Sequence, residues 1–260
     1  MDLYNEMQNY IGLFLLIFVR ISGMVVLAPV IGSRNIPPYV KAGFSLMMTL
    51  IALPLLGGTN VIIPDHLLSY LFLVASELIC GMTIGFVSSL IFAAVQMTGS
   101  LLDTQIGFGM VNVFDPQAGQ QVPLIGNFQY ILGLLFFLSL DGHHILLTAL
   151  FDSFKIVPIS TVTFHAALTE YIVTLVSGIF VVAFKITLPV LIAIIIADVA
   201  LGILARTMPQ MNIFVVGVPA KIIVGIFVLS TVLPYFIRFL EVGFNVMYQD
   251  VYRLLEIFRP

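Results

Sequence analysis

This sequence of 260 residues is poor in the residues that soluble proteins use for chemistry and for contacts made in water. Only 9% of its residues are charged, and Cys80 is its single cysteine. With one cysteine, the chain can form neither an internal disulfide nor a metal site of several thiolates. Lysine and arginine are clustered nowhere and the net charge is −3, so nothing could follow a phosphate backbone. Nucleic-acid binding is therefore excluded.

Common enzyme signatures are also missing from the sequence. Neither the metal motif H-E-x-x-H nor the nucleophile motif G-x-S-x-G occurs. Asp141, His143 and His144 could suggest metal ligands, but two adjacent histidines without further ligands are more typical of polar interface residues. We therefore expect no metal, no cofactor and no enzymatic activity.

Hydrophobic residues, by contrast, make up 60% of the chain, and the mean hydropathy is +1.15. Both values lie well outside the range of soluble globular domains and indicate an integral membrane protein. Near the N-terminus, Asp2 and Glu6 stand where a secretory signal would carry lysine or arginine, and Arg20 interrupts the apolar run that follows. We expect the first helix to be a permanent membrane element.

Apolar runs separated by turn-rich joints divide the sequence into helical segments. About 20 apolar residues are needed for a helix to cross the hydrocarbon of a bilayer. Pro189 and Pro219 each remove a helix hydrogen bond inside such a run. The sequence thus predicts an all-α membrane protein of about six long, kinked hydrophobic helices in hairpins, from runs at about 11–31, 42–56, 67–102, 124–140, 171–205 and 213–237.

The basic residues of the loops give no clear membrane orientation. Orientation normally follows from an excess of lysine and arginine on one side. Here the two sides are nearly equal, which suggests a protein that is not held in the bilayer in the ordinary way. One side carries Arg34, Lys41 and Arg206, and the other carries Lys155, Arg238, Arg253 and Arg259.

Arg20, Glu77, Lys185 and Asp198 lie well inside the apolar runs. Each would cost roughly 2.5–3.5 kcal/mol at the centre of a bilayer, so the four side chains should not all face lipid. Two interpretations are open. The charges line a path for ions or protons, or they snorkel, pair with one another, or pack against partner subunits.

One helix face in the third run consists of small residues at four-residue spacing. Gly81, Gly85 and Ser89 form this face. Small residues so spaced let two membrane helices approach closely. We predict that the face is a packing surface and that it serves subunit packing.

The stretch GFGMVNVFDPQAGQQVP, residues 107–123, is too rich in turn formers for a membrane helix and too apolar for an ordinary solvent loop. Its glycines, including Gly107, Gly109 and Gly119, let the backbone turn sharply. Its apolar side chains could close a narrow pore by excluding water, and they include Phe108, Met110, Val113 and Phe114. The alternative is a loop that only packs between two helices.

The stretch LARTMPQMNIFVVGVPAKI, residues 204–222, carries a specific pattern: Arg206, Pro209, Gln210, Asn212, Phe214, Gly217, Pro219 and Lys221. This pattern resembles the FliR family, the R component of the flagellar type III export gate, whose injectisome counterpart is the T component. Residues 20–46 and 105–117 agree as well, so the resemblance covers essentially the whole chain.

The resemblance implies a fold in two parts. Residues 1–170, including loop 103–123, would be similar to the P gate subunit with four helices. Residues 171–260 would be a C-terminal helical hairpin similar to the Q subunit. In that family, five P, four Q and one R subunit form a conical assembly around a channel, raised toward the periplasm, which would account for the balanced loop charges.

The resemblance also implies roles and partners. Loop 107–119 would plug the closed channel with Gly107, Phe108, Gly109, Met110, Val113 and Phe114. Pro209, Asn212 and Gly217 would fix the last hairpin, and Arg206 and Lys221 would meet neighbouring subunits. The partners would be FliP and FliQ, the B and A components FlhB and FlhA, and unfolded flagellar export substrates, at the flagellar basal body in the bacterial inner membrane. The alternative function is a secondary solute or ion transporter.

Overall fold

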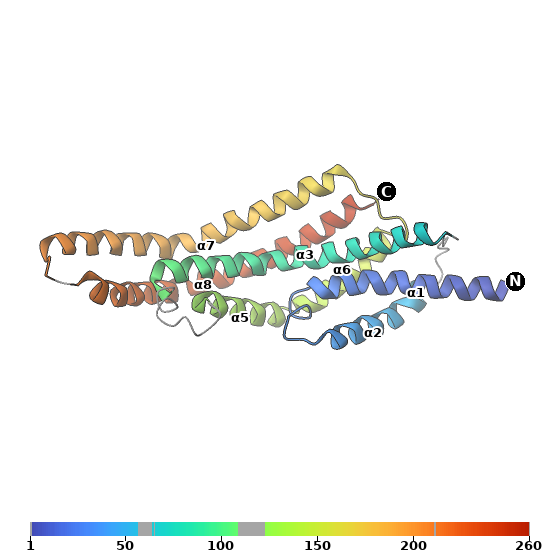
Figure 1. Cartoon of the computed structure of the whole chain (residues 1–260), viewed down its shortest axis with the longest axis horizontal. Coiled ribbons are helices and arrows are strands. Elements are labelled where there is room, and N and C mark those ends of the chain that lie inside the picture. Colours follow the sequence, from blue (N-terminus) through green and yellow to red (C-terminus); the bar gives the residue numbers. More distant parts are fainter. Residues whose placement is uncertain (1, 57–63, 65, 109–122, 211, 260) are drawn as a thin grey trace. The chain divides into compact units, whose positions relative to one another are not determined.

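The computed structural model describes residues 2–56, 64, 66–108, 123–210 and 212–259. These residues form seven α-helices and no strand, as the ribbon in Figure 1 shows. The helices are α1 (Asp2–Leu27), α2 (Pro38–Leu56), α3 (Leu67–Ile106), α5 (Leu124–Ser139), α6 (Gly142–Ile156), α7 (Ala166–Thr207) and α8 (Ile213–Ile257). The predicted all-α class is confirmed.

Five of these helices are long and apolar enough to cross a membrane, namely α1, α2, α3, α7 and α8. A sixth span results if α5 and α6, which only two residues separate, are counted together as one broken span. The prediction of about six hydrophobic helices is therefore confirmed. Helix α6 lies outside the predicted runs because it is amphipathic: it buries Leu146, Leu150 and Phe154 but exposes Lys155.

Helices α7 and α8 are longer than the apolar runs from which they were predicted. They have 42 and 45 residues, and both continue through prolines, Pro189 in α7 and Pro219 and Pro234 in α8. The apolar run ended at residue 237 because charged residues follow it. The helix continues because buried apolar side chains recur beyond that point at helical spacing, among them Leu240, Phe244, Val251 and Leu254.

The chain divides into two compact units, each built from several separate segments. Unit 1 comprises Met1–Leu90, Asp141–Leu175 and Asn245–Pro260, and unit 2 comprises Ile91–Leu140 and Val176–Phe244. Helices α3, α7 and α8 each contribute to both units. The predicted division into residues 1–170 and 171–260 rests on resemblance to two gate subunits, whereas these two units are defined by their internal contacts. The predicted division therefore stays a prediction.

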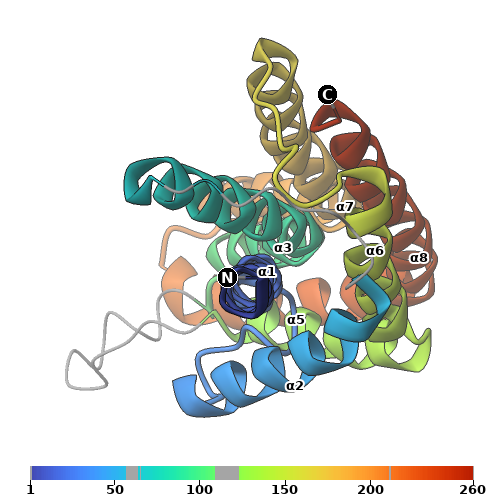
Figure 2. The ribbon, with the colours of Figure 1, turned by 90° about the vertical axis from the view of Figure 1, so that its right-hand side faces the viewer.

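In unit 1, helix α2 lies alongside α1, as both views of the ribbon show (Figures 1 and 2). Helix α1 is the centre of the core of this unit. Its side chains Leu16, Ile17 and Ile21 are fully buried, as are Ile84 of α3 and Leu150 of α6.

In unit 2, residues of α3, α5, α7 and α8 form the core. Three aromatic rings pack together with centroids 5.3 to 5.6 Å apart: Phe92, Phe137 and Phe244. A second cluster buries Leu102, Ile106, Ile125, Val190 and Ile194. The end of α3 is therefore held firmly in the core of this unit.

Candidate functional site

The predicted plug loop lies mostly outside the described residues. Gly109, Met110, Val113 and Phe114 belong to residues 109–122, of which the structure gives no account, so their role stays a prediction. Its first two residues are described. Gly107 has φ of +103°, a conformation that favours glycine. Phe108 packs against the cluster around Leu102 and Ile106, so this ring has a place in the core of unit 2.

Asp103 ties the beginning of this loop to its end. Its two carboxylate oxygens accept hydrogen bonds from the backbone N–H groups of Ile125 and Gly126, at 3.0 and 3.1 Å. These N–H groups lie in the first turn of α5, where Pro123 supplies no side-chain cap. The buried carboxylate of α3 therefore caps α5 from a distance, which also places its negative charge at the positive end of that helix dipole.

Two glycines bring α3 and α5 into contact near the same place. A Cβ atom on Gly99 would lie 2.0 Å from the Cα of Gly126 and 2.5 Å from its nitrogen. Since real Cβ atoms do not approach backbone so closely, the crossing requires glycine at this position. Together with Asp103, this crossing holds the two helices that flank the loop close together.

The small-residue face of α3 lies against α1 within unit 1. A Cβ atom on Gly81 would lie 2.0 Å from the carbonyl oxygen of Arg20, and one on Gly85 would lie 2.6 Å from that of Met24. From the other side, a Cβ atom on Gly23 of α1 would lie 2.7 Å from the carbonyl oxygen of Leu78 in α3. The two helices thus touch backbone to backbone at these glycines. Ser89 donates a hydrogen bond to the carbonyl of Phe86 in its own helix.

Arg20 and Glu77, two of the charges inside apolar runs, form a buried ion pair in unit 1. The distance from Arg20 Nε to Glu77 Oε2 is 2.5 Å, and both side chains are almost completely buried. Glu77 Oε1 accepts a further hydrogen bond from the backbone N–H of Ser160, at 2.9 Å. For this pair, the interpretation that the charges pair with one another agrees with the geometry.

The rest of the Arg20 guanidinium is held by α6 and the residue after it. Its Nη1 donates to the carbonyl oxygens of Ser153 and Val157, at 3.1 and 2.8 Å, and its Cζ lies 4.6 Å from the centre of the Phe154 ring. Nη2 is buried and has no partner among the described residues. One arginine thereby links α1 to both α3 and α6.

Asp198 and Lys185, the other two charged residues inside apolar runs, differ in whether they form an ion pair. Asp198 of α7 forms an ion pair with Lys221 of α8 within unit 2. Lys185 of α7 is exposed and has no ion pair with any residue that the structure describes. Of the residues predicted to meet neighbouring subunits, Lys221 therefore has a partner inside its own chain.

The residues of the family pattern surround the turn between α7 and α8. Arg206 is exposed in the last turn of α7. Its positive charge is stabilised there by the negative end of the helix dipole. Pro209 is exposed in the turn, and the backbone carbonyl of Asn212 accepts from the N–H groups of the first turn of α8. Gly217 is buried in α8. The roles predicted for these residues stay predictions.

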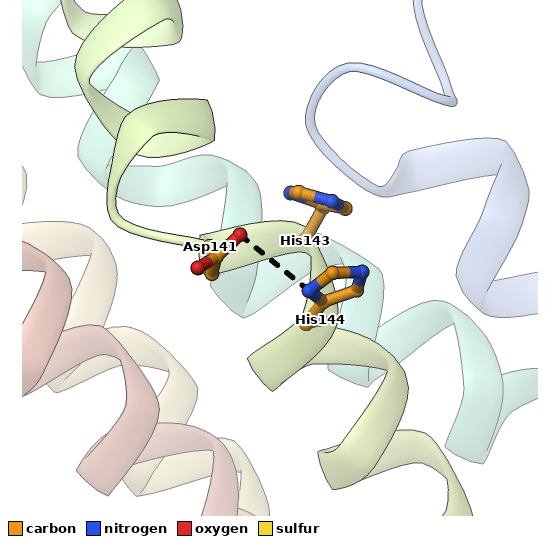
Figure 3. Close-up of side chains that lie close together, drawn as sticks. All are labelled: Asp141, His143 and His144. Carbon is orange, nitrogen blue, oxygen red and sulfur yellow. Dashed lines mark ion pairs between the residues drawn. The ribbon is translucent and has the colours of Figure 1, made fainter.

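Asp141, His143 and His144 lie close together at the start of α6 (Figure 3). The nitrogen and oxygen atoms with which they could bind a metal lie within 4.8 Å of one another. Asp141 Oδ1 is 3.5 Å from His144 Nδ1. Asp141 has φ of +55° and forms no side-chain cap. Since residues at i and i+3 meet whenever a helix turn forms, this contact requires no ligand. That these histidines are polar interface residues stays a prediction.

Known proteins resemble the chain over almost its whole length. Residues 11–247 match the family described as Bacterial export proteins, family 1. The flagellar biosynthetic protein FliR of Bacillus subtilis is 37% identical, over 86% of this chain and 87% of that protein. FliR of Pectobacterium carotovorum is 34% identical over 91% of this chain and 90% of that protein, and FliR of Escherichia coli is 28% identical over 96% and 94%.

Proposed function

Because the chain belongs to the FliR family of flagellar biosynthetic proteins, a family of bacterial export proteins, we propose that it is the R subunit of the flagellar type III export gate. In this role, it assembles with five FliP and four FliQ subunits into the channel through which unfolded flagellar proteins leave the cell. FlhB and FlhA are the neighbouring export components. The assembly lies at the basal body in the inner membrane.

The observation that carries this proposal is the family match over residues 11–247, which includes the predicted plug loop and the whole pattern around the α7–α8 turn. The exposed surface supports it. Large hydrophobic side chains are exposed along α2, α7 and α8. Contiguous exposed apolar surface of this kind fits either lipid or partner subunits. The chain is a component of the export channel, and the energy for export comes from other components.

Loop 107–119 acts as the plug of the closed channel in this proposal. A pore wide enough for an unfolded polypeptide would conduct ions at rest unless apolar bulk closed it, since a hydrophobic constriction excludes water. Asp103 and the Gly99–Gly126 crossing support this role because they fix both ends of the loop. A loop with fixed ends can be displaced by a substrate and return to the same place.

The test is a leak measurement on the assembled complex. Met110, Val113 and Phe114 are replaced together by serine, and the chain is co-expressed with its FliP and FliQ homologues. We expect native mass spectrometry to show an intact complex while the membrane becomes permeable to small ions. Background conductance in a complex of correct mass would mean that the loop is not the seal.

Phe108→Ser serves as the matched comparison. Phe108 packs against the core cluster of unit 2, so its loss should lower stability in addition to any leak. A leak that appears only with this substitution would point to loosened packing rather than to a lost plug.

A secondary solute or ion transporter is the second candidate, favoured by Lys185, which has no ion pair with any described residue, and by the proline-containing helices α7 and α8. Expression of the chain without FliP and FliQ separates the two functions. The export-gate subunit should aggregate or be degraded when alone, whereas a transporter should purify as a folded monomer or a small symmetric oligomer.

A further inference from the structure

Lys185 lies on the outward face of α7 in unit 2. The inward face carries Ala183, Ile186 and Val190, all of which are buried. The outward face is a regular stripe of exposed side chains three or four residues apart, which lie on one side of a helix. Its members are Val181, Lys185, Leu188, Ile192, Ile196, Val199 and Ile203. Lys185 is the only charged member of this stripe.

None of the carboxylates that the structure describes in unit 2 forms an ion pair with Lys185. Asp103 is buried and accepts from two backbone N–H groups of α5. Asp198 is paired with Lys221. Glu241 is exposed on α8 and forms no ion pair within the described part of the chain. Within the described part of unit 2, Lys185 therefore presents a positive charge without a counter-ion among apolar side chains.

The exposed apolar surface around Lys185 is longer than the hydrocarbon that an untilted helix crosses. Exposed hydrophobic side chains extend from Phe180 to Leu204 on α7, a distance of about 36 Å at a rise of about 1.5 Å per residue. On α8 they extend from Val215 to Val242, about 40 Å by the same rise. The hydrocarbon of a bilayer is only about 30 Å thick. Tilting can bring part of this length into the bilayer, and the apolar surface that remains, which is unfavourable in water, should be covered by another protein surface.

We propose that the stripe of α7 docks an apolar helix of a partner gate subunit, and that this helix carries an aspartate or glutamate that pairs with Lys185. Charge complementarity defines the occupant, because a lysine within an apolar interface is stable only when a carboxylate meets it. Gly178, seven residues before Lys185, has open space at its Cβ position and allows a close helix approach. This inference rests on the proposed export-gate function and adds the residue and the chemistry of the contact.

The first experiment uses charge substitutions in the full chain, co-expressed with FliP and FliQ homologues. Lys185→Glu should lower the amount of assembled complex on native gels at least tenfold, and Lys185→Met should lower it less, because methionine keeps apolar contact without repulsion. The amount of chain in the membrane reports on folding separately. The control is Arg34→Glu, the same charge reversal at an exposed residue between α1 and α2 that forms no ion pair within the described part of the chain.

The second experiment identifies the occupant. A photoreactive benzophenone amino acid in place of Lys185 should cross-link the chain to FliP or FliQ in the assembled complex, at or next to a carboxylate residue. Substituting lysine for that carboxylate should restore assembly to Lys185→Glu.

Some outcomes would overturn this inference. Cross-links to lipid alone, or full assembly of the Lys185→Glu variant, would show that the stripe does not dock a carboxylate-bearing helix, and the export-gate function would stand. Failure of the wild-type chain to assemble with FliP and FliQ would instead count against the proposed function itself.

Discussion

Arg20 and Glu77 pair across the contact between α1 and α3, and the glycine at which these helices touch, Gly81, rests on the carbonyl oxygen of Arg20 itself. The ion pair and the backbone contact therefore depend on one another. If the helices moved apart, the guanidinium and the carboxylate would separate. If the pair were lost, a buried charge would remain at the tightest point of the contact.

Glu77→Gln tests the pair. Because glutamine keeps the size of the side chain but leaves the Arg20 charge without its counter-ion, we expect a loss of about 3–5 kcal/mol of stability. The midpoint of thermal unfolding of the purified complex measures this loss. Replacing both partners, Arg20→Met with Glu77→Leu, should cost much less than the single change.

The control for this substitution is Glu170→Gln, at an exposed glutamate of α7 in the same unit. Its unfolding midpoint should match that of the wild type. If Glu77→Gln behaved like this control, the pair would contribute little to the stability of unit 1.

Gly81→Ala tests the backbone contact. The added methyl group would lie 2.0 Å from the carbonyl oxygen of Arg20, a backbone atom that cannot move aside without moving α1. We expect destabilisation of about 1–3 kcal/mol from overpacking, seen as less folded chain in the membrane. Gly43→Ala on α2 is the matched control, since nothing lies within 4 Å of its Cβ position. Alanine there should be neutral or should favour the helix slightly.

The sequence was sufficient to predict the long apolar helices, but neither their ends nor α6. Long apolar runs indicate membrane helices whatever their neighbours are, and five such spans are present. The ends of α8 and the whole of α6 depend on burial of single apolar side chains among polar ones, for example Phe154 and Leu254. Such burial follows from tertiary packing and gives only a weak signal in a hydropathy pattern.

The candidate site was predictable in part. A charge within an apolar run is visible in the sequence, but its partner is not, so Arg20 and Glu77 could be singled out without being joined. Asp103 was not singled out at all, although it is a charged residue near the end of an apolar run. Its role depends on the first turn of α5, more than 20 residues away, and only the folded chain brings the two together.

Asp103→Ala should weaken the connection between α3 and α5. The substitution removes two hydrogen bonds to an ionised acceptor and leaves the N–H groups of Ile125 and Gly126 unsatisfied in a buried place. We expect a loss of about 1.5–3 kcal/mol, measured as a lower unfolding midpoint of the complex. Thr104→Ala is the control, because the exposed Thr104 hydroxyl donates to the carbonyl of Ser100 in its own helix and to no other residue that the structure describes. Equal midpoints for the two variants would argue against a role for Asp103 as an anchor.

The pair of Asp198 and Lys221 allows a sharper test, because Lys221 was expected to contact neighbouring subunits and yet has a partner in its own chain. Lys221→Glu places two carboxylates side by side on α7 and α8, so we expect their repulsion to loosen the hairpin and to reduce assembly on native gels. The exchanged variant, Asp198→Lys with Lys221→Asp, restores opposite charges within the chain. If the pair serves only the hairpin, assembly should return to nearly the wild-type amount. If assembly stays low while the membrane contains normal amounts of the chain, Lys221 also faces an acidic group on another subunit, because the exchange repairs the first contact but not the second.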